Sequence, residues 1–367
     1  SYAVFVYLFW IFVTSVTSSM PLVSFKFLLA RIWFIAVFYF LAILILKNSR
    51  SIQVFILCYT IPMLGIVVYS LSRHLSYGLF DKKAAHFVME PFFRDHTSYG
   101  AVLAILFFAT GGLFLNKKRN ILYSILLGGS WLLLTIGLLL SYTRAAWISV
   151  VVAFCVLILI HFKVKIKYLI VQVILIAVYL IGQRAQIVQK MERNRQVSSA
   201  AFSEHIKSIS NITTDDSNLE RLNRWNAAFR MAEEKPFFGW GPGTYMFKYA
   251  PYQRSYDKTA ISTDFGDLGN AHREYIGPLV EMGIPGLLSF LLICITGIMT
   301  GMRVYRRLEE RKLKRTILFL FLGFVTYLIH GMLNNFLDTD KASALFWGIL
   351  AIFVSMDLSL KELNAKH

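Results

Sequence analysis

The chain has 367 residues, of which 56% are hydrophobic and 15% aromatic, and its mean hydropathy is +0.57. A water-soluble protein would not carry so much apolar surface. The net charge of +17 would suit a nucleic-acid-binding protein, but much of the excess lies in short stretches between apolar runs, as membrane orientation requires. We therefore expect an integral membrane protein with membrane lipids around it and no nucleic-acid partner.

Apolar runs of about 18 or more residues recur, and each is long enough to cross a hydrocarbon core of about 30 Å. They do not alternate as the strands of a membrane barrel do, so helices are expected. The fold class predicted is an all-α polytopic membrane protein with about ten transmembrane helices. They are expected at 2–20, 28–46, 52–72, 97–115, 121–140, 145–162, 168–182, 276–300, 315–337 and 343–360.

Every second connection between these runs is basic, and the positive-inside rule places such connections in the cytoplasm. Both termini are then cytoplasmic, and the outer side receives 141–144, 183–275 and 338–341. Three parts follow: spans 1–7 in 1–182, a partly helical outer loop in 183–275, and spans 8–10 with a cytoplasmic tail in 276–367. Ser1 in place of an initiator Met suggests trimming, with further spans before it. The basic connections are Lys47–Arg50, Lys117–Arg119, Lys163–Lys167 and Arg303–Arg315.

The outer loop contains a clear helix signal. Ser217 and Glu220 form a capping box, and Pro236 ends the helix that follows after about Lys235. Four apolar residues at helical spacing predict its buried stripe. They are Leu222, Trp225, Phe229 and Ala232.

Two arginines, Arg221 and Arg224, fall in the first turns of this helix. Guanidinium groups beside a positive helix N-terminus favour phosphate binding, although both also fit ordinary surface arginines. A third arginine, Arg144, joins two spans on the outer side, where the positive-inside rule does not explain it. It either snorkels to the interface or contributes to an anion site at the headgroup level.

One histidine, His272, lies where the loop re-enters the membrane, in NAHREYIGPLVEMGIPGLL from Asn270 to Leu288. An imidazole with a pKa of about 6.5 can accept a proton at neutral pH. Taken alone, an interfacial polar residue is the simpler interpretation of this histidine.

These features together resemble the O-antigen ligase and O-antigen polymerase superfamily of bacterial membrane glycosyltransferases. The ligases carry His, a polar residue, nine residues and Gly-x-x-Gly, and here His272 and Arg273 precede Gly283-Ile-Pro-Gly286. SYTRAAW (141–147), RLNRW (221–225) with PFFGWGPG (236–243), and EPFFRDHTSYGAVLA (90–104) are similar to other elements of that superfamily. The resemblance extends over about residues 90–355.

The resemblance implies a membrane-embedded fold of the GT-C type in the bacterial inner membrane, with its active site on the periplasmic face. It implies a glycan donor on undecaprenyl pyrophosphate and a lipid A-core acceptor, as in lipopolysaccharide biosynthesis. Arg144 and Arg221 would then bind the pyrophosphate, with Arg224 as a weaker helper. His272 would be the general base, with inversion at the anomeric carbon and no metal or other cofactor.

The roles of two further sites in the sequence are left undecided. Arg273 stands where the family usually has an amide or a serine, which leaves the acceptor contacts in question. Asp338-Thr-Asp340 on the outer side is a possible cation-binding pair or a polar turn. We favour a third interpretation, in which Asp338 orients His272 or contacts the acceptor, as an acidic residue of this region does in the superfamily.

Other functions remain as alternatives. A polymerase of the same superfamily would add the glycan to another repeat unit, and a scaffold would need no such site. A lipid-linked glycan transporter would need ionisable groups near the bilayer midplane and broken helices there. We expect almost none there: Gln53 and Gln172 are uncharged, and His330 is the one interior candidate, with packing as its simplest role.

Overall fold

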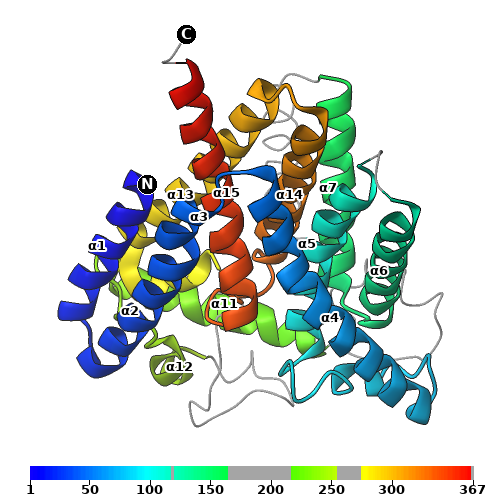
Figure 1. The fold of residues 1–367 in the computed structure, drawn as a ribbon. Coiled ribbons are helices and arrows are strands. Elements are labelled where there is room, and N and C mark those ends of the chain that lie inside the picture. The colour runs from blue at the N-terminus through cyan, green and yellow to red at the C-terminus, as the bar shows by residue number, and fades with distance from the viewer. Residues whose placement is uncertain (117–119, 164–215, 254–273, 365–367) are drawn as a thin grey trace.

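The computed structural model describes residues 1–116, 120–163, 216–253 and 274–364, with the side chains of 216–222 and 363–364 excepted, and these residues form a bundle of helices (Figure 1). Eight helices in this part of the chain are long and apolar enough to cross a membrane. The prediction of an all-α polytopic membrane protein is therefore confirmed. The expected span 168–182 lies outside the described residues, and the expected span 2–20 is a shorter apolar helix.

The helices follow the apolar runs closely. α2 continues through a π-helical turn, Ala36–Leu41, into α3, so that Pro21–Ile45 is one candidate span. The helices are α1 (Tyr2–Val16), α2 (Pro21–Ile35), α3 (Ala42–Ile45), α4 (Ser49–Tyr77), α5 (His96–Phe114), α6 (Ile121–Leu140), α7 (Arg144–His161), α11 (Asp216–Glu234), α12 (Tyr245–Lys248), α13 (Ile276–Arg307), α14 (Arg311–His330) and α15 (Asp340–Asn364), with short 3-10 turns at Ala84–His86 and Ala250–Tyr252.

The central helix of one half of the bundle is α5, which packs against α4, α6, α7 and α14. It is apolar all round, and almost every residue from Ser98 to Leu113 is buried. A helix of that kind belongs in an interior. By contrast, α6 exposes a row of large apolar side chains, among them Ile121, Ile125 and Leu132, which suits a lipid-facing position.

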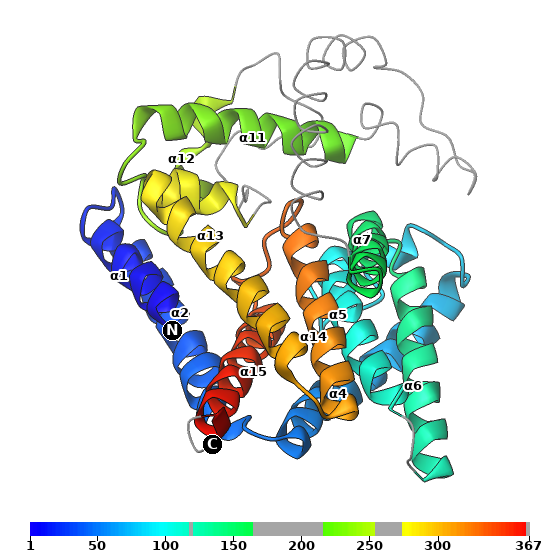
Figure 2. The ribbon, with the colours of Figure 1, turned by 90° about the horizontal axis from the view of Figure 1, so that it is seen from above.

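The bundle has two chemically different ends, seen in Figure 2. At the basic end, Arg315 donates to the carbonyl of Leu115, and Asn116 donates to Thr316 over 3.1 Å, so the end of α5 meets the start of α14. At the other end, which we call the loop end, Thr143 bonds the carbonyl of His96 and α11 and α12 cover the start of α13. The end of α5 and the start of α14, which both adjoin predicted basic connections, therefore share one end of the bundle.

The predicted loop helix is present as α11, but its buried face differs from the prediction. Phe229 is 45% exposed, whereas Arg224 is only 9% exposed. The helix lies against α12 and the start of α13 through the small or flexible side chains of Ala228, Met231 and Ala232. Close approach of these helices favours small residues at the contact, so the buried face is rotated away from Phe229.

The PFFGWGPG segment joins α11 to α13 through a break in α13. Gly283 has φ 69° inside α13, so the helix opens there. The freed carbonyls of Val280 and Glu281 accept hydrogen bonds from Trp240 and Gly241, at 3.0 and 2.8 Å. Backbone groups that a helix break would leave without partners are thus satisfied.

The glycines of this junction are required by close contact as well as by conformation. A Cβ on Gly283 would lie 2.1 Å from the carbonyl oxygen of Phe237, and one on Gly239 would lie 2.4 Å from the Glu281 backbone. Gly239 also has φ 66°. These contacts explain why the predicted tight turn has a glycine at position 239 and why the Gly-x-x-Gly pair begins with one at position 283.

We expect Gly283→Ala to lower the free energy of unfolding by more than about 2 kcal/mol, because the new Cβ meets strain and overlap together. Thermal unfolding of the purified protein in detergent measures this change. Gly129→Ala in α6 is the matched control, since a Cβ there meets nothing within 4 Å. Equal stability of the two variants would contradict the close packing at the α13 break.

Candidate functional site

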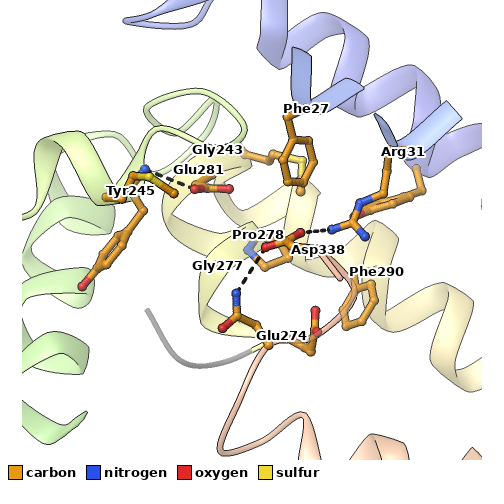
Figure 3. A pocket seen from close by; sticks show the side chains of 14 residues that line it. Phe27, Arg31, Gly243, Tyr245, Glu274, Gly277, Pro278, Glu281, Phe290 and Asp338 are labelled. Carbon is orange, nitrogen blue, oxygen red and sulfur yellow. Dashed lines mark hydrogen bonds and ion pairs between the residues drawn. The ribbon is translucent and has the colours of Figure 1, made fainter. Parts of the chain in front are cut away.

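A cavity of about 210 Å³ opens at the loop end between α1, α2, α12, α13 and the α14–α15 connection (Figure 3). Its lining combines aromatic rings with one arginine and three acidic side chains. The residues that matter most here are Tyr7, Phe27, Arg31, Tyr245, Glu274, Glu281, Phe290, Asn335 and Asp338.

The arginine of the cavity, Arg31, comes from the third turn of α2 and is 6% exposed. Its guanidinium lies 4.8 Å from the centre of the Phe27 ring, one helical turn earlier. One terminal nitrogen donates to the carbonyl of Leu337, and the other donates to Asp338 over 2.6 Å. A buried cation needs such partners, and the pair ties α2 to the α14–α15 connection.

Glu274 precedes α13 and fixes its start to the same connection. Its Oε1 atom accepts hydrogen bonds from the hydroxyl of Tyr327 and from the backbone amides of Phe336 and Leu337, at 2.6, 2.5 and 2.7 Å. Its own amide donates to the carbonyl of Gly331 over 3.0 Å. One carboxylate therefore shapes both the entry to α13 and the chain beyond α14.

The protonation of Glu274 is set by opposing effects. Burial and then the charge of the Asp338 carboxylate raise the pKa of Glu274, while the charge of Arg31 lowers it. The hydrogen bonds that it accepts also lower it, but burial prevails and the pKa is about 7. This carboxyl group can thus carry or release a proton near neutral pH.

Glu281 lies at the break in α13 and completes the acidic lining. Its side chain accepts from the backbone amide of Tyr245 over 3.1 Å, and the amide of Gly243 also donates to it. The PFFGWGPG turn therefore holds this carboxylate at the cavity.

Carboxyl groups outnumber cations in the lining, because Arg31 is the one arginine or lysine among the described lining residues and is already bonded to Asp338. Such a surface accepts hydrogen bonds from hydroxyl and amino groups and disfavours anions. Within the described residues, no group of three His, Cys, Asp or Glu side chains has the geometry to hold a metal ion.

Of the predicted site residues whose side chains the structure describes, only Asp338 lines this cavity. It is bonded by Arg31 and, over 3.3 Å, by Asn335. The predicted contact of Asp338 with His272 is untested, because His272 and Arg273 lie outside the described residues. Asp340 is exposed at the start of α15.

The predicted phosphate-binding arginines lie elsewhere at the loop end. Arg144 is the first residue of α7 and is half-buried. Arg224 packs with its guanidinium 5.8 Å from the ring of Tyr249, and its carbonyl accepts from the Tyr245 hydroxyl. Arg221 is in the second turn of α11, and its side chain is outside the described part. Whether these arginines share one anion site stays a prediction.

The expectation that His330 is the one interior ionisable candidate is incomplete. Arg31 and Glu281 both lie within candidate spans and both face the cavity. A lone arginine in the apolar run 21–45 was the available signal, since a charge at that depth requires a partner. His330 itself is buried with its ring 5.5 Å from that of Phe336, as expected for packing.

The pKa of Glu274 is about 7 in the folded protein, whereas the ordinary value is 4.5. Between these two pH values the folded protein therefore keeps a proton on Glu274 that the unfolded chain has released. We expect the free energy of unfolding to fall by up to about 3 kcal/mol as pH rises from 5 to 8. Glu274→Gln should reduce this dependence, whereas Glu233→Gln on the exposed face of α11 should leave it unchanged. Chemical unfolding at several pH values measures it, and an unchanged slope in Glu274→Gln would refute the assignment.

A comparison with protein families identifies residues 128–291 as an O-Antigen ligase domain. The matched range contains Arg144, Arg221, Arg224, His272 and the Gly283–Gly286 pair, and it ends before Asp338. No curated protein matches the chain. The family is one of glycosyltransferase-like membrane enzymes, in agreement with the helices that can span a membrane. The resemblance seen in the sequence is thereby confirmed: this multi-pass membrane protein carries a domain of the O-antigen ligase superfamily.

Proposed function

We propose that the protein is an O-antigen ligase, which transfers a glycan from undecaprenyl pyrophosphate to lipid A-core at the periplasmic face of the bacterial inner membrane. The observation that carries the proposal is the family match over residues 128–291, which includes the three arginines and His272. A polymerase of the same superfamily, with a repeat unit as acceptor, is the alternative.

The donor pyrophosphate is assigned to Arg144 and Arg221. Arg144 opens α7 at the loop end, where the free backbone amides of a helix N-terminus add to the attraction for an anion. Guanidinium groups meet phosphate oxygens with two parallel hydrogen bonds and keep their charge at all physiological pH values. Arg224 has a supporting role, since its guanidinium stacks on Tyr249 and is mostly buried.

The transfer step needs a base and a stabilised leaving group. His272 takes the proton of an acceptor hydroxyl, and the oxygen forms a bond to the anomeric carbon as the bond from that carbon to the phosphate oxygen breaks. The electron pair leaves with undecaprenyl pyrophosphate, whose growing negative charge the arginines stabilise. Attack from the opposite face inverts the anomeric carbon, and no metal takes part in this scheme.

The identity of the reaction is tested with purified protein, a lipid-pyrophosphate-linked glycan and lipid A-core, in the presence of EDTA. Glycan on lipid A-core is the expected product. Longer glycan that remains on polyprenyl pyrophosphate would establish the polymerase instead. Movement of donor lipid across a bilayer without any sugar transfer would establish a transporter.

We expect His272→Ala to lower the transfer rate by about 10²–10⁴-fold, because a general base contributes that much. Donor binding should stay unchanged and is measured by equilibrium binding of the lipid-linked glycan. His161→Ala at the basic end is the matched control, since His161 is exposed there. Loss of donor binding together with transfer would indicate a structural role for His272.

We expect Arg221→Lys to lose most activity, although the charge is kept, because an ammonium group cannot replace the planar guanidinium fork. Activity is compared with Arg50→Lys, a conservative change at an exposed position of the basic end. If Arg221→Lys transferred glycan at the wild-type rate, the assignment of Arg221 to the pyrophosphate would be lost.

A further inference from the structure

We infer that the cavity between α1, α2, α13 and the α14–α15 connection binds one uncharged or amino-bearing sugar ring of the acceptor. The inference rests on the proposed transfer and adds the chemistry of the acceptor group that lies next to the base. It concerns residues of α1, α2 and the α14–α15 connection that the matched family range does not contain.

Charge is the first argument. Arg31 is satisfied by Asp338 and by the carbonyl of Leu337, so its charge is not available to an incoming anion. Glu274 and Glu281 accept hydrogen bonds from neutral groups of the described residues, and neither forms an ion pair there. A phosphate would therefore meet carboxyl groups and no unpaired arginine or lysine among the described lining residues, whereas a hydroxyl or an ammonium group would find hydrogen-bond acceptors.

A carboxylate at the cavity wall is the second argument. Glu274 is 6% exposed, and its three donors among the described residues all bond Oε1. The side chain lines the cavity, so a sugar hydroxyl there would donate a hydrogen bond to Oε2.

Shape is the third argument. The rings of Tyr7 and Phe290 lie 6.1 Å apart in the lining, and Phe27 comes from α2 beside Arg31. Flat apolar surfaces of this kind suit the carbon face of a sugar ring, while the carboxylates take its hydroxyl groups. The volume of about 210 Å³ is below the roughly 300–1,000 Å³ of pockets for larger ligands, so one ring fits rather than a chain.

Position assigns the ring to the acceptor rather than to the pyrophosphate. Glu274 follows His272 by two residues, which span at most about 7 Å of chain. No described lining residue comes from α7 or α11, the helices that carry the proposed phosphate-binding arginines. The proposed base thus precedes a cavity-lining residue by only two positions, which favours the acceptor over the pyrophosphate as the ligand of this cavity.

Binding of three small probes to the full-length protein, without donor, tests the inference. The probes are methyl glucoside, methyl glucosaminide and methyl glucoside 6-phosphate, measured by ligand-detected NMR. We expect the amino sugar to bind most tightly, because its ammonium group forms a charged hydrogen bond with a carboxyl group of the cavity. The phosphorylated sugar should bind at least about tenfold more weakly than the neutral sugar, because its phosphate faces the same carboxyl groups. Equal or tighter binding of the phosphorylated sugar would overturn the inference.

Glu281→Gln supplies the residue-specific test. The amide oxygen can still accept from Tyr245 and Gly243, so the turn should be kept while the charge is lost. We expect about tenfold weaker binding of the amino sugar and an unaltered thermal unfolding temperature. Glu233→Gln, outside the cavity, should bind like wild type. If Glu281→Gln lost its fold, Phe27→Leu would test the aromatic wall with the neutral sugar. Wild-type affinity in a folded variant contradicts the site.

The transfer assay separates this inference from the proposed function. In Glu281→Gln we expect the KM for the acceptor to rise and the KM for the lipid-linked donor to stay unchanged. A rise in the donor KM alone would overturn the assignment to the acceptor. Sugar binding as expected with no transfer by wild type would contradict the proposed function while leaving the sugar site in place.

Discussion

The need to satisfy polar groups inside a membrane bundle governs the loop end of this protein. α13 is interrupted at Gly283, and its freed carbonyls are bonded by the PFFGWGPG turn. The chain after α14 is irregular, and its amides are bonded by Glu274. Each departure from helix is thus compensated by one specific partner, and the cavity lies between the two departures.

The sequence predicts the spans well because apolar length is a strong and local signal. The ends of α5, α6 and α13 agree with expectation to within a few residues, apart from the basic end of α13, which is longer than predicted. The loop helix α11 also follows from a local signal, its capping box and the proline after it. The buried face of α11 does not follow from a local signal, because it depends on which partner the helix packs against. Phe229 looks like a core residue in the pattern, yet Arg224 takes the inner position.

The cavity illustrates the larger difficulty. Its lining comes from residues as far apart as Tyr7, Arg31, Glu281 and Asp338, and no spacing in the sequence connects them. Asp338 stands out by its place in the chain, whereas no motif marks its partner Arg31, which lies in an apolar run. The family resemblance points to His272 and to the arginines proposed to bind phosphate, since these belong to short motifs. It could not supply side chains from the first two helices, where the match does not extend.

The PFFGWGPG turn touches two separate parts of the bundle. Besides its bonds to α13, the carbonyl of Trp240 accepts from Ser19, and that of Pro242 accepts from Ser24 over 2.9 Å. The turn therefore links the α1–α2 hairpin to α13 through hydrogen bonds. With its walls held in this way, the cavity is pre-organised, and little ordering cost remains for a ligand that enters it. A related protein could then change its acceptor by exchanging individual wall residues, without redesign of the surrounding backbone.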